Sequence, residues 1–365
     1  MIEIPFVNLK KQYDCCKDSI DSAISDTIDR SSFITGPDVI HFENTIAEWV
    51  RSESCASTGS GTTALLCALK AVGIKKGDEV ITTPHTFVAT SESIINAGAT
   101  PIFVDIDPTT GLIDTNKIGE KITKNTKAIL FVDIYGQCPD ITKIRKICDL
   151  NSLYMIEDAA QSFGNVYNGK RVGSLSDLTC FSFNPVKNLG AMGDAGCVTG
   201  DKDLIQKVKE YRDHGRTSRY QIEKIGYNAR IDNLQANIVL AKLPYLNEWI
   251  QEKQKICNYF NESLKNHVGT LELEENNTHS YYVYVIKSKN RDKLKTILNE
   301  SGIQTNIHYA VPCNLHPAFK EYHTKCHITE TLCDEILSLP CWAGLTDTEI
   351  EYIAETTKKA SLQCG

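Results

Sequence analysis

The stretch Leu153-Tyr154-Met155-Ile156-Glu157-Asp158 is an apolar run that ends in two carboxylates. Two similar runs precede it, at Pro101–Asp105 and Ala128–Asp133. Segments with helical spacing of apolar residues lie between them, such as residues 141–148. Apolar strands that alternate with helices indicate an α/β fold with a mostly parallel central sheet, covered on both faces. Ligands bind beyond the carboxyl ends of such strands, so we expect Asp158 to lie near a functional site.

The same alternation continues to about residue 245, and a different pattern follows it. Short strands are expected at 179–183 and 196–199, and helices at 201–213 and 233–243. After residue 245 we expect a long helix at 246–264, an alternating strand at 281–286, and helices at 291–301 and 346–358. We therefore predict a large α/β domain over residues 1–245 and a smaller α+β domain over residues 246–365.

The charge, the cysteine pattern and the lack of long apolar runs argue against several classes of protein. The 365 residues include 39 lysines and arginines against 46 aspartates and glutamates, a net charge of −7, which argues against a nucleic-acid binder. The 14 cysteines are scattered without any CxxC pair, which indicates reduced thiols rather than disulfides or a zinc site. A signal-peptide pattern and a run of about 20 apolar residues are both lacking, so we expect a cytoplasmic protein with no membrane contact.

Two nucleotide motifs and one metal motif are set aside. GxGxxG does not occur, and the phosphate-loop near-miss Gly164–Lys170 is followed by Arg171 where a hydroxyl is needed. Asn168-Gly169 within it fits a hairpin turn. His323 and His327 are four residues apart but have no third ligand nearby, so we expect a solvated helix face and no metal.

Two further segments are ambiguous when each is considered alone, but together they indicate a cofactor site. Thr58–Leu65 places small residues and hydroxyls before a helix, which suits either a phosphate group or an ordinary helix cap. Lys187 follows an apolar strand and a proline, where a Schiff-base lysine and an exposed loop lysine are both plausible. Asp158 and the aromatic Phe87 complete a set that a pyridoxal phosphate site needs: lysine, carboxylate, phosphate cradle and ring plane.

The residues that carry this set resemble a known family. Over Phe6 to Pro340 the chain resembles the DegT/DnrJ/EryC1/StrS sugar aminotransferases, above all in Ile156–Gly164 and Phe181–Gly190. Gly193–Gly196 and Gly226–Asp232 support the resemblance. It implies the fold type I architecture of aspartate aminotransferase, pyridoxal 5′-phosphate as cofactor, and transfer of an amino group to a nucleotide-linked keto-sugar, with glutamate as donor.

The resemblance also implies a role for individual residues. Lys187 matches the catalytic lysine that binds the cofactor and shuttles a proton. The other cofactor positions are Asp158 for the pyridine nitrogen, Gln161 for the phenolic oxygen, Phe87 for ring stacking, and Gly61, Thr62 and Ser182 for the phosphate. Asn228 matches a residue that reaches the phosphate from the partner subunit, which implies a homodimer with shared active sites.

The chain departs from the family pattern at two places. Thr63 stands where many members have aspartate, and Ala195 replaces a glycine. Neither change removes a group that the chemistry needs. A related dehydratase branch has histidine at the lysine position, so Lys187 favours amino transfer over dehydration.

The sequence gives weaker evidence on which sugar carbon is aminated, C3 or C4. Phe6–Tyr13, Asn228–Ala236 and His308–Pro312 look like the branch that acts on 3-keto hexoses, with a 4-keto sugar as the alternative. Arg230, His308 and Tyr309 are then candidate substrate contacts. The basic cluster of Arg212, His214 and Arg216 fits contact with a nucleotide diphosphate or a solvated loop. A non-catalytic regulatory or binding protein on the same fold is the alternative from another class.

Overall fold

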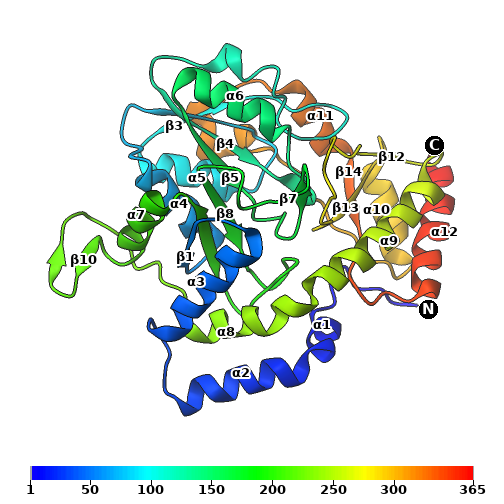
Figure 1. Cartoon of the computed structure of the whole chain (residues 1–365). Helices are drawn as coiled ribbons and strands as arrows, with labels where there is room; N and C mark the ends of the chain where they lie inside the picture. The colour runs from blue at the N-terminus through cyan, green and yellow to red at the C-terminus, as the bar shows by residue number, and fades with distance from the viewer. Residues whose placement is uncertain (1, 365) are drawn as a thin grey trace.

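The protein is described by a computed structural model that covers residues 2–364. Its centre is a seven-stranded sheet with the strand order β1-β9-β8-β5-β4-β2-β3 (Figure 1). The strands are β1 (Ser54–Thr58), β2 (Glu79–Thr82), β3 (Thr100–Phe103), β4 (Thr126–Val132), β5 (Tyr154–Asp158), β8 (Leu178–Ser182) and β9 (Gly196–Gly200). Only β9 runs antiparallel to its neighbours, β1 and β8. The predicted mostly parallel sheet is confirmed.

Two layers of helices cover the sheet and form two apolar cores. On one face lie α3 (Pro37–Val50), α6 (Ile141–Asn151) and α8 (Asn233–Lys242), which share one buried apolar cluster with the strands. On the other lie α4 (Gly61–Ala71), α5 (Val88–Ala97) and α7 (Lys202–Arg212), which share a second cluster. The strands are buried on both sides, which explains why they read as continuous apolar runs.

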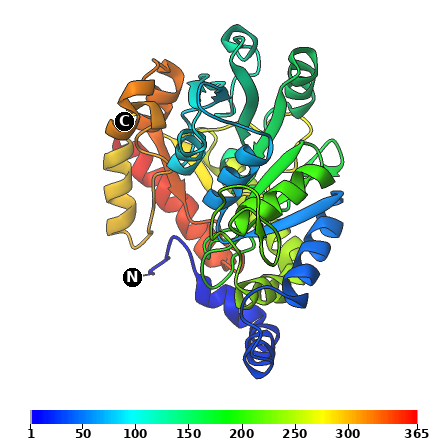
Figure 2. The same ribbon diagram turned by 90° about the vertical axis from the view of Figure 1, so that its left-hand side faces the viewer.

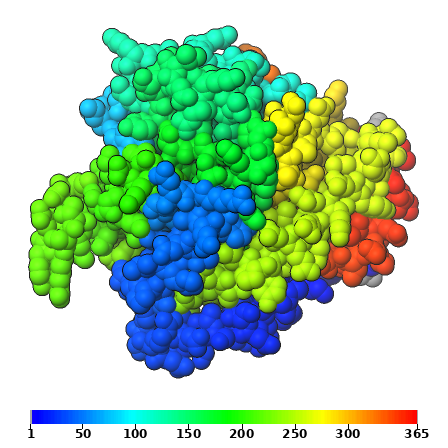
Figure 3. Space-filling view, in the orientation of Figure 1, coloured from blue at the N-terminus to red at the C-terminus, as the bar shows by residue number. Residues whose placement is uncertain are grey.

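Three smaller elements project from this body. The N-terminal helices α1 (Leu9–Cys15) and α2 (Lys17–Asp29) lie along its lower edge, with α2 packed against α8. The hairpin β6 (Val166–Tyr167) and β7 (Lys170–Arg171) turns at Asn168 and Gly169, both with positive φ, so the predicted hairpin is confirmed. A second hairpin, β10 (Arg216–Ser218) and β11 (Gln221–Ile222), extends from the body as an arm (Figure 3).

The C-terminal third forms a smaller unit beside the large sheet (Figure 2). Its three-stranded antiparallel sheet consists of β12 (Gly269–Thr270), β13 (Tyr284–Lys287) and β14 (Ile336–Leu339). The helices are α9 (Leu246–Leu264), α10 (Arg291–Glu300), α11 (His327–Glu335) and α12 (Asp347–Cys364). Ile4, although N-terminal, is buried in the core of this unit and pairs with Ile303. The domain boundary at residue 245 stays a prediction.

Some local expectations need correction. The strand expected at 281–286 begins three residues later, because Tyr281 has a positive φ that a strand does not allow. His323 and His327 do not share a helix: a 3-10 turn ends at Tyr322 and α11 begins at His327. Within residues 2–364 no group of three or more metal-binding side chains comes together.

The cysteine prediction agrees with the structure. All 14 cysteines are free, and only Cys15 is exposed. No helix among the described residues is long and apolar enough to cross a membrane.

Candidate functional site

The candidate site lies at the carboxyl-end edge of the large sheet. β5 and β8 are parallel neighbours that end at Asp158 and Ser182, and Asp158 is in register with Cys180. α4 starts from the same edge, just after β1. Parallel strands therefore bring Asp158, Ser182 and the first turn of α4 together, although they are distant in the sequence.

Asp158 is a buried carboxylate held by hydrogen bonds alone. Its Oδ2 accepts a 2.6 Å bond from the Thr90 hydroxyl, and its Oδ1 accepts a 3.3 Å bond from the backbone N–H of Ala160. Burial raises the pKa of Asp158, while these two bonds and the charge of Lys187 oppose that rise. Among residues 2–364 no cation lies within ion-pairing distance of it. The site thus presents a buried carboxyl group without a bonded cation.

Lys187 is half-buried on the loop that follows β8. Its ammonium nitrogen lies 4.2 Å from the centroid of the Tyr282 ring. Burial lowers the pKa of Lys187 to about 8, although the charge of Asp158 acts in the opposite direction. The loop is tight, because a Cβ on Gly190 would come within 2.3 Å of the Pro185 carbonyl oxygen. A lysine with such a pKa is partly a neutral amine near neutral pH.

The start of α4 forms a cradle of small groups. A Cβ on Gly61 would come within 2.8 Å of the Ser182 Cβ, so only glycine fits there. Ser60 caps the helix: its hydroxyl accepts from the Thr63 N–H, and the Thr63 hydroxyl accepts from the Ser60 N–H at 3.0 Å. Thr63, the departure from the family pattern, thus closes a capping box. The first backbone N–H groups of α4, with Thr62 half-exposed beside them, are suited to an anion.

Gln161 is fixed at both ends of its amide. Its Oε1 accepts from the backbone N–H of Tyr135 at 2.7 Å, and its Nε2 donates to the Tyr309 hydroxyl at 2.9 Å. One Nε2 hydrogen remains to donate elsewhere. Tyr309 also lies against Phe87, whose half-exposed ring is 5.8 Å from it, centroid to centroid. Gln161, Phe87 and Tyr309 therefore surround one space.

His308 lies on the other side of Tyr309. Its Nδ1 bonds to the Ser338 hydroxyl at 2.9 Å, and its ring stacks on Phe6 at 5.5 Å. Burial, aided by the charge of Lys187, lowers the pKa of His308 to about 4. His308 is thus a neutral ring at neutral pH and lines the same cavity as Lys187.

Two predicted residues lie apart from this group within the chain. Asn228 is exposed beside the hairpin arm, where it pairs with Asp213. Arg230 forms an ion pair with Asp213 and borders a separate cavity of about 90 Å³. In the basic cluster, Arg212 is an ion-pair partner of the buried Glu43 rather than a solvated loop residue.

Sequence reasoning missed three residues that hold the site. Tyr135 adopts a positive φ and is buried; its hydroxyl bonds to His85 Nε2 at 2.8 Å and to the His308 carbonyl. It therefore supports both Gln161 and the segment that carries His308. Thr90, which bonds to Asp158, did leave a signal: Thr86 and Thr90 are one helical turn apart, and their hydroxyls are 2.7 Å from each other. No sequence signal marks Tyr135 or His85.

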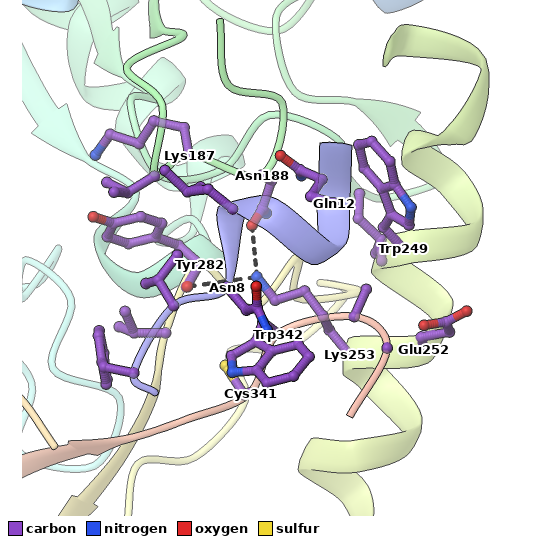
Figure 4. Close-up of a pocket in the computed structure, with 18 of the residues that line it drawn as sticks. Asn8, Gln12, Lys187, Asn188, Trp249, Glu252, Lys253, Tyr282, Cys341 and Trp342 are labelled. Carbon is purple, nitrogen blue, oxygen red and sulfur yellow. Dashed lines mark hydrogen bonds between the residues drawn. The ribbon is translucent and has the colours of Figure 1, made fainter. Parts of the chain in front are cut away.

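A cavity of about 470 Å³ extends from Lys187 between α1, α9 and the segment after β14 (Figure 4). Polar groups that line it include Asn8, Gln12, Asn188 and Lys253. Trp249 and Trp342 supply aromatic walls.

Comparison with known proteins shows extensive similarity to one group. A model of the DegT/DnrJ/EryC1/StrS aminotransferase family matches residues 14–358. UDP-2-acetamido-2-deoxy-3-oxo-D-glucuronate aminotransferase of Pseudomonas aeruginosa is 38% identical over 96% of this chain and 98% of that protein. A pleiotropic regulatory protein of Geobacillus stearothermophilus is also 38% identical, over 97% of each chain.

A solved aminotransferase structure has the same fold as this chain. NtdA from Bacillus subtilis, with the bound cofactor PMP, the pyridoxamine form, aligns with a TM-score of 0.93 at 29% identity. The alignment covers 100% of this chain and 86% of that one. The predicted fold type I architecture is thereby confirmed.

Proposed function

Because the chain belongs to the DegT/DnrJ/EryC1/StrS aminotransferase family, we propose that it aminates C3 of a nucleotide-linked 3-keto hexose, with glutamate as the amino donor. Aminotransferase activity and the pyridoxal phosphate cofactor follow from the family and the solved relative. Our proposal adds three points to this: the position of amination, the amino donor and the roles of individual residues. The observation that carries them is the meeting of Lys187, Asp158 and the α4 cradle at one sheet edge.

The residues present fit pyridoxal phosphate. Asp158 is a buried carboxylate without a bonded cation, which suits the protonated pyridine nitrogen. The cradle at Gly61, Thr62 and Ser182 has N–H and hydroxyl donors and space that a Cβ would fill, which suits a phosphate. Lys187 would hold the cofactor through its amine, Gln161 has an amide hydrogen left for the phenolic oxygen, and Phe87 offers its ring face.

The chain's own groups supply binding and proton transfer. When bound, the cofactor supplies an electron sink that acidifies the donor's α-hydrogen. Lys187, with a pKa of about 8, can take up a proton and return it without a large cost in free energy. The hydrogen bonds from Thr90 and the Ala160 N–H favour the ionised form of Asp158 and oppose the rise in its pKa that burial causes.

Substrate recognition is proposed for His308, Tyr309 and Arg230. His308 lines the cavity at Lys187, and Tyr309 lies between Phe87 and Gln161, so both are placed to contact a sugar. The P. aeruginosa relative is named for a 3-oxo sugar, which supports C3 over C4. Arg230 lies in a different cavity of its own chain, so its proposed contact is with the site of a partner subunit.

We propose a homodimer with shared sites. The arm β10–β11 and the loop after it expose large apolar side chains: Tyr220 is 88% and Ile225 is 89% exposed. Such side chains on a projecting arm are typical of a segment that packs on a second subunit. Asn228 lies six residues after the end of β11 and would reach the partner's phosphate site. The proposed location is the cytoplasm, where the free thiols stay reduced.

The test follows the bound cofactor by its visible absorption. Wild type should show a protein-bound band that changes on addition of glutamate, and Lys187→Ala should lack the band. A wild type with bound cofactor that does not respond to glutamate would favour the regulatory alternative, which the G. stearothermophilus relative suggests by name. Product analysis with UDP- and dTDP-linked 3-keto and 4-keto sugars then tests the position, and amination only at C4 would contradict it.

A further inference from the structure

Two thiols lie together at the wall of the cavity that extends from Lys187, and the proposed chemistry uses neither. Cys341 follows β14 by two residues and lines the cavity (Figure 4). Cys257, on α9, is 0% exposed and belongs to the same buried apolar cluster as Cys341. The Cys257 thiol donates a hydrogen bond to the Cys341 sulfur. One thiol of a contacting pair is therefore open to a small molecule in the cavity.

A cation completes this group. Lys253 lies one helical turn before Cys257 on α9, so the two side chains share a helix face. Its amine donates to the Asn188 side-chain oxygen at 2.8 Å and to the Tyr282 carbonyl oxygen at 3.5 Å. Burial lowers the pKa of Lys253, and the charges that oppose this are those of Cys341 and Cys257. Within residues 2–364, therefore, a thiolate is the group that compensates the charge of this lysine.

The contacts favour the thiolate at Cys341 over Cys257. Donation from Cys257 and the charge of Lys253 lower the pKa of Cys341 to about 7, against the effect of burial. A backbone hydrogen bond from Tyr284 acts in the same direction. Burial and the bond to Cys341 raise the pKa of Cys257 well above its usual value. Because the thiolate is the nucleophilic form of cysteine, Cys341 is suited to attack and Cys257 to the following step.

A second thiol pair in the large sheet lacks these features. Cys55 on β1 and Cys197 on β9 also share a hydrogen bond, but neither lines the cavity. Burial raises the pKa of Cys197 well above its usual value, and Cys55, Cys180 and Glu43 act in the same direction. Contact between two thiols is thus not enough to favour a thiolate. The lysine and the cavity distinguish the pair at Cys341.

We propose that Cys341 and Cys257 form a redox-sensitive dithiol, in which Cys341 reacts with hydrogen peroxide in the cavity and Cys257 converts the product to a disulfide. In the first step the Cys341 sulfur attacks one peroxide oxygen, the O–O bond breaks, and a sulfenic acid and a hydroxide form. In the second step the Cys257 sulfur attacks the Cys341 sulfur, the S–O bond breaks, and a second hydroxide leaves. The hydroxides take up the two thiol protons, so the peroxide is reduced to two waters while two thiols become one disulfide.

The disulfide would act on the candidate site through Lys253. A disulfide carries no charge, so the amine would lose its compensating thiolate while it still donates to Asn188, the residue after Lys187. An ammonium group largely removed from water is costly when its acceptors are all neutral. We therefore expect Lys253 and the loop at Lys187 to shift, and oxidation to lower activity until a thiol reductant restores it.

The chemical test treats the holoenzyme with hydrogen peroxide and follows its cysteines by peptide mass spectrometry. Wild type should give a disulfide-linked pair of peptides that contain Cys257 and Cys341, while Cys55 and Cys197 stay reduced. Cys257→Ser should instead accumulate a sulfenic acid on Cys341, which dimedone traps. If Cys257 and Cys341 stay reduced at a dose that oxidises the exposed Cys15, or if Cys55 and Cys197 link as fast, the proposal is overturned.

A matched pair of lysine variants tests the cation without changing a thiol. Lys253→Met should slow the linkage of Cys257 to Cys341 about ten-fold at neutral pH, the effect of raising the pKa of Cys341 by about one unit. Lys255→Met, on the exposed side of α9, should link as fast as wild type. Retention of the cofactor band shows that each variant has folded. Equal rates in the two variants would overturn the assignment of Lys253.

The response of the cofactor band to glutamate then tests control of the site. In wild type the response should be lost after peroxide and return after dithiothreitol. Cys15→Ser, which removes the exposed thiol at the same cavity, should behave as wild type, whereas Cys341→Ser should keep its response. Linkage without loss of the response would overturn the proposed control. An untreated wild type that does not respond to glutamate would contradict the proposed function, while the peptide measurement would still decide whether the dithiol forms.

Discussion

Replacement of Glu157 by glutamine tests how the fold tolerates two buried acids beneath the site. Glu157 and Asp133 are both 0% exposed. Glu157 Oε2 accepts from Thr179 at 2.8 Å and Ser176 at 3.1 Å, and Asp133 Oδ2 accepts from Ser162. The other oxygen of each carboxyl, Oε1 and Oδ1, has no partner among the described residues. A proton held between them would satisfy both.

The pKa shifts of Glu157 and Asp133 determine whether the stability of the fold rises or falls with pH. Burial raises the pKa of Glu157 to about 7, and burial together with the Glu157 charge raises that of Asp133 well above its usual range. The folded protein thus keeps a proton that the unfolded chain releases above its ordinary pKa of 4.5. Stability from this proton is complete below pH 4.5 and is lost as the pH rises to about 7. At about 1.4 kcal/mol per pH unit, the loss over this interval is about 3 kcal/mol.

In Glu157→Gln the amide can donate to Asp133 without titrating, so this loss should disappear. The free energy of unfolding of the variant, relative to wild type, should therefore rise by about 3 kcal/mol between pH 4.5 and pH 7. Urea denaturation of the apoprotein at one protein concentration measures it, with the exposed Glu262→Gln as the control. If the difference between variant and wild type is the same at every pH, Glu157 is ionised in the folded protein and the reasoning is wrong.

Three further variants test the groups around the cofactor. Thr90→Val removes the 2.6 Å bond to Asp158 and should weaken cofactor retention about ten-fold to a hundred-fold in dialysis followed by visible absorption; unchanged retention would contradict its role. Gly61→Ala brings a Cβ within 2.8 Å of Ser182 and should lower cofactor affinity, whereas Gly119→Ala, where a Cβ would meet nothing within 4 Å, should bind as wild type; equal affinity in the two variants would contradict the steric argument. Tyr135→Phe should lower the free energy of unfolding by about 1–3 kcal/mol in denaturant titration, and a neutral result would show that its hydroxyl bonds contribute nothing.

The sheet could be predicted from the sequence because its strands are buried on both faces. Their apolar runs need no knowledge of distant contacts, and the carboxylate at the end of β5 marks the edge where ligands bind. The roles of Lys187 and Gln161 came from resemblance rather than from pattern. On physical grounds alone, Lys187 was no better than an exposed loop lysine.

Other features depend on contacts that no local pattern reveals. Tyr135 holds Gln161, 26 residues away, and the His308 carbonyl, 173 residues away. The cavity at Lys253 forms only when α9, α1 and the segment after β14 come together. His323 misled the prediction because spacing of four residues was taken to mean a helix, whereas the chain turns before α11 begins.

The position of Ile4 has a consequence for synthesis of the protein. Ile4 is buried among residues of the C-terminal unit and pairs with Ile303, so nearly 300 residues separate it from its partner. On the ribosome this segment emerges long before Ile303 and must remain unpaired until that residue has left the exit tunnel. We therefore expect a bulky fusion placed directly before Ile4 to slow the packing of the C-terminal core. It should not slow the formation of the large sheet.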